Sequence, residues 1–246
     1  MKIAAALLFL IFSSSLCPAA EIVVGSFSTG NLSGWEAKLF KGKTDYTLVT
    51  DGDTKVLMAH SRHAASGLLR KISLDTRKHP LLRWSWKVSH SLKKEDITRK
   101  SGADFAARVY VVFPRTFFWQ TRAINYVWAS KMPKNSSAPS PYTANAMIIA
   151  VESGDGNAGN WVTEERNIHE DYKRLFGEAP PTLGAVAVMS DTDDTRDEVT
   201  AWYGDIYLEE TGTVTGTHGA GTGTAVSRPA SSVSPAVSPA SPAPLR

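Results

Sequence analysis

Two segments of the chain place apolar residues at every second position, and this alternation restricts the possible folds more than any other feature. Residues 81–88 read Leu-Leu-Arg-Trp-Ser-Trp-Lys-Val, and residues 105–113 read Phe-Ala-Ala-Arg-Val-Tyr-Val-Val-Phe. A period of two residues is typical of a β-strand that buries one face. We therefore expect Leu82, Trp84 and Trp86 on a buried face, with Arg83 and Lys87 on the opposite face.

Short apolar segments bounded by turn residues predict further strands at 22–24, 46–49, 56–59, 67–72, 147–152, 185–189 and 202–208. Only residues 168–176 have convincing helical spacing, and Gly177 follows where a helix C-terminal cap belongs. Many strands with one short helix predict an all-β fold, a jelly-roll-like sandwich of two sheets. An α/β fold would need helices between the strands.

The two ends of the chain differ in composition from residues 21–210, which we expect to form a single domain. In residues 1–20, Lys2 precedes a ten-residue apolar run, and small residues lead up to Ala20. This pattern predicts a signal peptide and hence export to the periplasm or the extracellular space. Cys17 offers lipid attachment as an alternative, but Leu16 stands where that motif requires a small residue.

Residues 211–246 are rich first in Gly and Thr and then in Ser, Pro and Ala, which predicts a disordered tail. The tail is either a spacer through an envelope layer or an unselected extension. The formal net charge of +3 comes from both ends, because residues 21–210 hold 24 basic and 24 acidic residues. A neutral domain argues against nucleic-acid binding. No transmembrane segment is expected after signal removal, and the sequence does not predict an oligomeric state.

Polar and aromatic residues gather on the faces opposite the expected core, namely Arg83, Lys87, Asp104, Arg108, Tyr110, Tyr203 and Asp205. Such a set suits a glycan or another small polar ligand, because charged groups hydrogen-bond to hydroxyls and aromatic rings stack on C–H faces. The alternative is a solvated sheet face whose charges pair across strands. The ligand hypothesis expects Asp104, Arg108, Tyr203 and Asp205 to converge in one cleft.

We expect a binding protein rather than an enzyme, because the sequence contains no recognisable nucleophile motif or phosphate-binding loop. If the protein is instead a glycan hydrolase or lyase, Asp104 and Asp205 are the candidate acid and base. A third hypothesis is a structural component of the cell envelope.

The densest acidic segment, residues 190–198, contains Asp191, Asp193 and Asp194. Alternating carboxylates are ligands that Ca²⁺ prefers, so these three residues are a candidate calcium site. A turn between strands explains the same residues equally well, since Asp and Thr side chains cap their own backbone.

Two aromatic segments, 117–119 and 126–128, flank a connection rich in Lys, Pro and Ser at 129–141. We expect both to anchor the core at the ends of this connection. The alternative is a platform on which a sugar stacks, and exposure of the rings to solvent would favour that alternative over a core anchor.

Seven motifs follow one another in an order that resembles a known family: Phe27 to Trp35 with Gly34, Trp84-Ser-Trp-Lys87, Asp104-Phe-Ala-Ala-Arg108-Val-Tyr, Asn125-Tyr-Val-Trp128, Trp161 with Glu165-Arg-Asn167, Asp171-Tyr172 with Phe176-Gly177, and Asp191-Thr-Asp193-Asp-Thr195 with Tyr203-Gly-Asp205-Ile206. The family consists of bacterial exported proteins and is known as domain of unknown function 3047 (DUF3047). The resemblance implies export but no particular activity, cofactor or catalytic residue. The opening segment from Phe27 to Glu36 is also similar to the start of galactose-binding-like jelly rolls.

Overall fold

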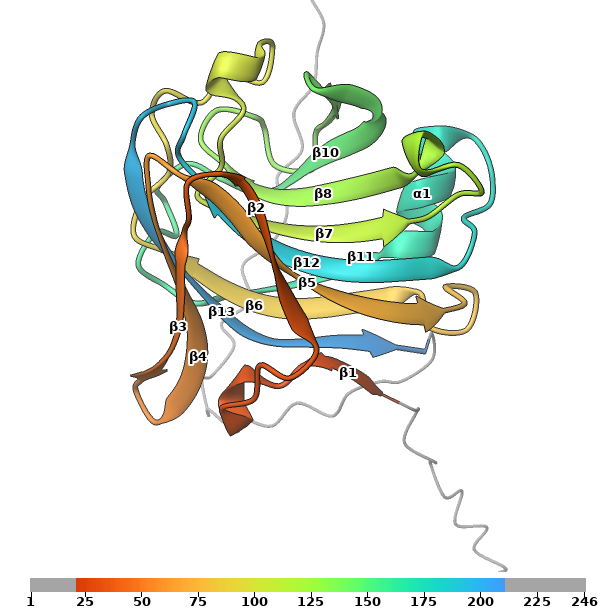
Figure 1. Ribbon diagram of the computed structural model, residues 1–246, viewed down its shortest axis with the longest axis horizontal. Coiled ribbons are helices and arrows are strands. Elements are labelled where there is room, and N and C mark those ends of the chain that lie inside the picture. Colours follow the sequence, from red (N-terminus) through yellow and green to blue (C-terminus); the bar gives the residue numbers. More distant parts are fainter. Residues whose placement is uncertain (1–20, 211–246) are drawn as a thin grey trace, which may run out of the picture. The chain divides into compact units, whose positions relative to one another are not determined.

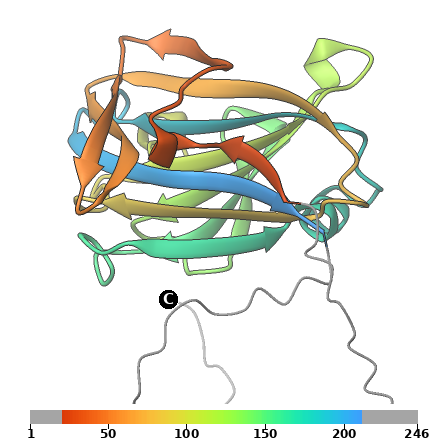
Figure 2. The ribbon, with the colours of Figure 1, turned by 90° about the horizontal axis from the view of Figure 1, so that it is seen from below.

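The computed structural model describes residues 21–210, and the predicted signal peptide and tail lie outside them. Two β-sheets pack face to face, as Figure 1 shows from one side and Figure 2 shows along the edges of the layers. The predicted two-sheet β-sandwich with one helix is therefore confirmed.

The first layer, which we call the β13 sheet, has the strand order β11-β6-β13-β4-β3, and β1 also pairs with β13. Its strands are β11 (Val162–Asn167), β6 (Leu81–Val88), β13 (Glu198–Glu209), β4 (Thr54–Arg62), β3 (Asp45–Asp51) and β1 (Ile22–Gly25). All of these pairs are antiparallel.

The second layer, the β12 sheet, has the order β2-β5-β12-β7-β8-β10-β9. Its strands are β2 (Trp35–Lys41), β5 (Ala65–Leu74), β12 (Leu183–Asp191), β7 (Ala107–Phe113), β8 (Arg122–Ala129), β10 (Thr143–Ser153) and β9 (Ser137–Ser140). Only β8 and β10 run parallel. Short 3-10 helices occupy Phe27–Thr29, Lys100–Gly102 and Phe118–Gln120.

Aromatic rings from both sheets meet between the layers. Trp84 and Trp86 of β6 are buried, as alternation predicts, and face Tyr126 and Trp128 of β8. The ring centroids of Trp84 and Tyr126 lie 5.4 Å apart, and those of Trp86 and Trp128 lie 5.9 Å apart. Because each such ring removes on the order of 200 Å² of surface from water, this ladder is a main source of attraction between the sheets.

The helix α1 (Ile168–Phe176) has the predicted bounds and connects β11 of one sheet to β12 of the other. The side chain of Asn167 accepts a hydrogen bond from the Glu170 backbone N–H and so caps the N-terminus. Gly177 closes the C-terminus at a φ of 71°, a left-handed conformation that favours glycine. No helix in the described part of the chain has the length and hydropathy of a membrane span.

Candidate functional site

The residues that the sequence places on one polar face lie on the outer faces of both sheets and in the interior between them. The outer face of the β13 sheet carries Arg83, Lys87 and Asp205, while Arg108 and Tyr110 line a groove on the β12 sheet. Tyr203 is buried between the sheets, and Asp104 is buried beside the β12–β13 turn. The expectation that Asp104, Arg108, Tyr203 and Asp205 share one cleft is therefore wrong.

A β-bulge in β13 explains why Tyr203 and Asp205 face opposite ways. Tyr203 pairs with Trp86 and Ile206 pairs with Trp84, so β13 contains one residue more than β6 over this stretch. The extra residue breaks the alternation that the sequence pattern assumes. Tyr203 consequently points inward and Asp205 outward.

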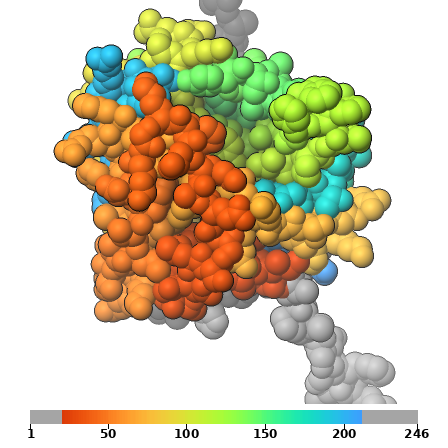
Figure 3. All heavy atoms as spheres, viewed as in Figure 1, coloured from red at the N-terminus to blue at the C-terminus, as the bar shows by residue number. Residues whose placement is uncertain are grey.

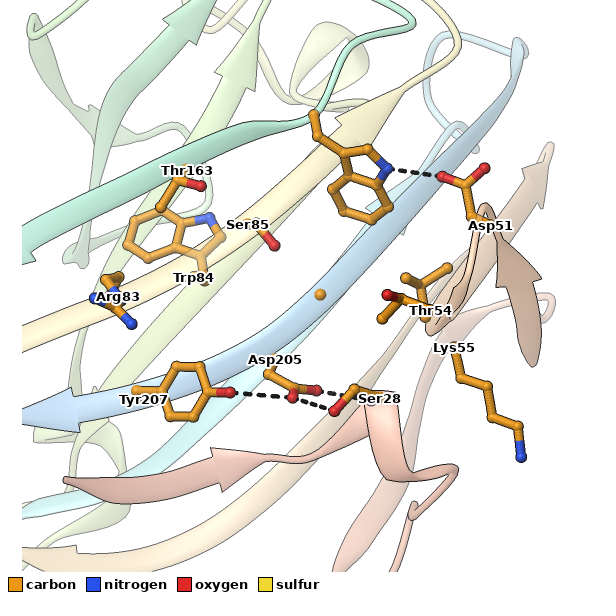
Figure 4. Close-up of a pocket in the computed structure, with 13 residues that line it drawn as sticks. Ser28, Asp51, Thr54, Lys55, Arg83, Trp84, Ser85, Thr163, Asp205 and Tyr207 are labelled. Carbon is orange, nitrogen blue, oxygen red and sulfur yellow. Dashed lines mark hydrogen bonds between the residues drawn. The ribbon is translucent and has the colours of Figure 1, made fainter. Parts of the chain in front are cut away.

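The outer face of the β13 sheet forms a pocket of about 610 Å³, which we call the polar pocket (Figure 4). This volume lies within the usual range for small-molecule sites. On one wall, Asp205 accepts hydrogen bonds from the Ser28 backbone N–H at 2.8 Å, the Ser28 hydroxyl at 2.5 Å and the Tyr207 hydroxyl at 3.1 Å. These bonds fix the carboxylate and the ring of Tyr207 beside it.

The Tyr207 ring also packs against a cation. The guanidinium carbon of Arg83 lies 5.6 Å from the ring centroid, and Arg83 pairs with Glu209 at 3.3 Å. Burial and the neighbouring Asp205 raise the pKa of Tyr207 to about 12, so its hydroxyl keeps its proton at neutral pH.

The second wall of the polar pocket is built around Asp51 and Trp161. The indole Nε1 of Trp161 donates to Asp51 at 2.7 Å, a bond drawn in Figure 4, and Lys87 Nζ binds the same carboxylate at 2.5 Å. The Lys87 ammonium also lies 5.2 Å from the Trp161 ring centroid. Trp161 is thus held in place while 39% of its surface stays exposed.

The floor of the polar pocket depends on a glycine in the bulge of β13. A Cβ atom at Gly204 would lie 2.1 Å from the Ser85 hydroxyl oxygen of β6, so a larger residue would displace that side chain. Among the charged residues that line the polar pocket, Lys55 and Arg83 balance Asp51 and Asp205. The arrangement offers hydrogen-bond partners and aromatic rings without an excess of either charge.

The outer face of the β12 sheet contains a separate, largely apolar groove in which Arg108 and Tyr110 lie. Arg108 Nε donates to Asp191 at 2.7 Å, Arg108 Nη2 binds the other oxygen of Asp191, and Nη1 donates to the Tyr110 hydroxyl at 3.1 Å. Arg108 and Asp191 are only 6% and 4% exposed. Burial raises the pKa of Asp191, and the adjacent guanidinium opposes this shift.

Asp104 holds the turn between β12 and β13. Its Oδ2 accepts hydrogen bonds from the Thr195 backbone N–H at 2.7 Å and the Thr195 hydroxyl at 2.8 Å. The part of β13 from Glu198 to Asp205 runs from this turn to the polar pocket. At the usual rise of an extended chain, it spans about 20 Å. Paired glycosidase carboxylates lie about 5–10 Å apart, so Asp104 and Asp205 do not form such a pair.

The acidic segment is arranged differently from the expected calcium site. Asp191 points to Arg108 and to the Phe105 backbone N–H, whereas Asp104 joins Asp193 and Asp194, with carboxylate oxygens within 4.8 Å of one another. Lys41 Nζ pairs with Asp193 at 3.3 Å. Asp191 is therefore not part of the cluster that contains Asp193 and Asp194. Calcium binding stays a prediction.

The two aromatic segments have different surroundings. Tyr126 and Trp128 anchor the core as expected, but Phe117, Phe118 and Trp119 are 49%, 83% and 60% exposed at the tip of the β7–β8 hairpin. This hairpin projects from the sandwich at the upper right of Figure 2. The expectation of a core anchor at 117–119 is therefore wrong.

Of the residues that line the polar pocket, only Arg83 and Asp205 are among the ligand residues predicted from the sequence. The side chains that build its walls, Asp51, Trp161 and Tyr207, are not. Tyr207 follows Asp205 by two residues, so the alternation of β13 places both side chains on the same face. This pattern is the sequence signal that indicates Tyr207. Asp51 and Trp161 meet across 110 residues of chain, and no local pattern indicates that contact.

The family model described as "Protein of unknown function (DUF3047)" matches residues 33–207. The chain belongs to this family. The match covers all of the polar pocket except Ser28, together with the groove on the β12 sheet. Among curated proteins, none matches the sequence.

Solved structures with a related architecture include the family 30 carbohydrate-binding module of a Clostridium thermocellum cellulosomal cellulase. It is 8% identical, has a TM-score of 0.44 and aligns over 79% of this chain and 99% of its own. The xyloglucanase domain of the Sinorhizobium fredii effector NopAA, in complex with cellobiose, is 9% identical, with a TM-score of 0.43 over 79% and 97% of the two chains.

An adhesin domain of Lys-gingipain from Porphyromonas gingivalis is 12% identical, with a TM-score of 0.39 over 78% of this chain and 99% of its own. Similarities at this level carry no argument about a ligand. The function is therefore argued from the residues of this chain.

Proposed function

We propose that the polar pocket binds an uncharged glycan and that the protein does not transform it. The observation that carries this proposal is that two aromatic side chains, Trp161 and Tyr207, lie on separate walls of one open pocket. The charges of the residues that line this pocket balance. The pocket volume of about 610 Å³ accommodates a short oligosaccharide segment.

The chemistry of sugars accounts for each part of this arrangement. A pyranose ring has an apolar C–H face that stacks on an indole or phenol ring, and a rim of hydroxyl groups that donate and accept hydrogen bonds. Asp205 and Arg83 offer an acceptor and a donor at the rim of the pocket. Because Lys55 and Arg83 offset Asp51 and Asp205, the lining favours a neutral glycan over a polyanionic one.

Binding without catalysis agrees with the electrostatics of Asp51. Hydrogen bonds from Lys87 and Trp161 lower the pKa of this carboxyl group. A general acid in glycoside hydrolysis needs the opposite shift, because it must hold a proton near neutral pH. Asp205 accepts three hydrogen bonds from Ser28 and Tyr207. A carboxylate has about four acceptor sites, so these bonds hold Asp205 in place and leave room for a ligand hydroxyl.

The test is binding of the protein to a panel of neutral and uronic-acid-containing oligosaccharides, followed by calorimetry on the best neutral binder. We expect Trp161→Ala to weaken binding by about tenfold or more, the equivalent of one aromatic contact. Trp119→Ala is the matched control, since Trp119 is also an exposed tryptophan but lies on the β7–β8 hairpin.

Two results would overturn the proposal: no binding anywhere on the panel, or equal affinity for the Trp161→Ala variant and the unaltered protein. Absence of binding together with capture of an envelope component would favour a structural role. Release of products from any oligosaccharide would favour a hydrolase or lyase.

We further propose that the chain is exported, a proposal supported by the charged and apolar pattern of residues 1–20. The test is N-terminal sequencing of the protein recovered from the periplasm or medium of an expressing bacterium. A mature chain that begins after Ala19 or Ala20 is expected. Recovery only from the cytoplasm with Met1 retained would contradict the proposal, and a lipid-modified Cys17 would support the lipoprotein alternative.

A further inference from the structure

A second cavity of about 610 Å³ lies on the outer face of the β12 sheet, on the opposite layer from the polar pocket. Gly67 of β5, Ala187 of β12 and Ala146 of β10 line this groove, and their small side chains leave it open. Phe40 of β2 borders it with 71% of its surface exposed, and Tyr142 of the β9–β10 turn borders it with 54% exposed.

In Figure 3, the groove lies between the orange-red atoms of β2 and the green atoms of the β9–β10 turn. Both neighbours extend beyond the sheet surface, so a molecule in the groove would contact apolar atoms on its floor and on two sides. Such surroundings favour a ligand with an apolar body.

The charges around the groove are already paired. Asp191 neutralises Arg108 at the floor. At the rim, Lys41 pairs with Asp193 at 3.3 Å, and Lys38 lies 3.7 Å from Glu36, whose nearer partner is Lys71 at 3.1 Å. A charged ligand on the floor would have to break the buried pair of Arg108 and Asp191, so the floor favours an uncharged molecule.

One polar atom on the floor has no hydrogen-bond partner among residues 21–210. Asn125 of β8 lines the groove and is 3% exposed. It lies opposite Tyr110 in the register of β7 and β8. Its Oδ1 atom is buried and accepts no hydrogen bond. Buried carbonyl oxygens are almost always hydrogen-bonded, because an unpaired acceptor away from water is unfavourable. Oδ1 has almost no surface open to the groove, so a ligand hydroxyl or N–H group reaches it once the side chains that cover it, Tyr110 among them, move aside. That group would then provide the missing donor.

We propose that this groove is a second binding site, for an uncharged small molecule with an apolar body and a hydroxyl or N–H group that donates to Asn125 Oδ1. A phenolic compound represents this chemistry. The site is independent of the polar pocket, because the two share no lining residue. It therefore does not depend on the proposed glycan function.

The test uses calorimetry on the full chain with two probes that differ mainly in the donor, 1-naphthol and 1-methoxynaphthalene. We expect 1-naphthol to bind about tenfold more tightly, the effect of one hydrogen bond to a buried acceptor. Asn125→Leu is expected to abolish this preference while keeping the apolar contacts. Ala187→Phe fills the groove from the outer face of β12 and should abolish binding of both probes.

Trp161→Ala is the matched control and should bind both probes as the unaltered protein does, because Trp161 lies in the polar pocket. Thermal melting of each variant separates loss of binding from loss of folding. If Asn125→Leu does not fold, Ala187→Phe together with the difference between the two probes still decides the question.

The proposal is overturned if 1-naphthol gives no saturable heat up to its solubility, or if Ala187→Phe binds it unchanged. It is also overturned if the two probes bind the unaltered protein equally, or if a folded Asn125→Leu variant keeps the preference for 1-naphthol.

Discussion

Replacing Tyr203 by phenylalanine is expected to destabilise the protein far more than the same replacement of Tyr207, although both residues lie on β13. The Tyr203 hydroxyl donates to the Met189 carbonyl at 2.7 Å, accepts from the Arg108 backbone N–H at 3.2 Å and lies 3.0 Å from the Ser190 hydroxyl. It thereby connects the β13 sheet to β12 and β7 of the opposite sheet, in a position with no solvent exposure.

The size of the effect follows from the groups that lose their partner. Tyr203→Phe leaves a backbone carbonyl and a backbone N–H without this bond in a dry interior. Each buried polar group left unsatisfied costs about 1–3 kcal/mol, so we expect a loss of about 2–6 kcal/mol of unfolding free energy. Tyr207 loses one bond to Asp205 at the partly exposed pocket wall, which predicts a loss of less than about 1 kcal/mol.

Urea unfolding monitored by tryptophan fluorescence measures this difference. With a slope near 2 kcal/mol per molar urea, a loss of 3 kcal/mol lowers the midpoint by about 1.5 M. Equal slopes for the unaltered protein and both variants are the check that only stability has changed. A loss below about 1 kcal/mol for Tyr203→Phe would refute the inward position of Tyr203, and with it the bulge that turns this residue away from Asp205.

Three further substitutions test other parts of the fold by the same measurement. Arg108→Met leaves Asp191 buried without its counter-charge and should cost about 3–5 kcal/mol, and adding Asp191→Asn should restore part of the loss. Burial raises the pKa of Glu95 from 4.5 to about 7, so the folded state holds this proton more tightly. Stability should therefore fall as pH rises from 4.5 through 7, and Glu95 contributes at most about 3 kcal/mol to this fall. Burial also raises the pKa values of Glu164 and Asp191, so Glu95→Gln should make the slope shallower without removing it, and an unchanged slope would contradict the assignment. Asn167→Ala should cost about 1 kcal/mol through loss of the cap on the Glu170 N–H, whereas Asn167→Asp should cost little.

Most strands that the sequence predicts have one face in the core, whereas β10 and β12 bury both faces and are predicted as short apolar runs between turn residues. Each expected strand coincides with an observed one, with β7 beginning at Ala107 rather than Phe105. Phe105 instead packs with Val127 and Ile148 in a second apolar cluster on the outer side of the β12 sheet. That cluster covers one face of β8 and the main core covers the other, so residues 124–129 are buried on both faces and do not alternate. The strand β8 is not among the predicted ones.

The other unpredicted strands, β2, β9 and β11, end the strand order of their sheets and expose much of their surface. Edge strands of this kind are held by pairing with a neighbour rather than by a buried face, so their sequences carry little alternation. The sequence pattern also does not predict the bulge near Gly204, which turns Tyr203 inward and Asp205 outward. A glycine within a strand pattern is its sequence signal, but only the register against β6 shows which side chains it redirects.

The separation of the two cavities leads to a final prediction about coupling. The aromatic ladder of Trp84, Trp86, Tyr126 and Trp128 fills the space between the layers, and sheets in such sandwiches lie about 10 Å apart. A ligand can couple to a distant site only through a difference in its affinity for two arrangements of the structure between them. A core of close-packed, fully buried rings offers no evident second arrangement. Saturating 1-naphthol should therefore leave glycan affinity unchanged within about twofold, or about 0.4 kcal/mol. A larger shift would mean that the two outer faces communicate, and the first residues to test for that role would be Tyr203 and Arg108, because their hydrogen bond joins β13 to the sheet that carries the groove.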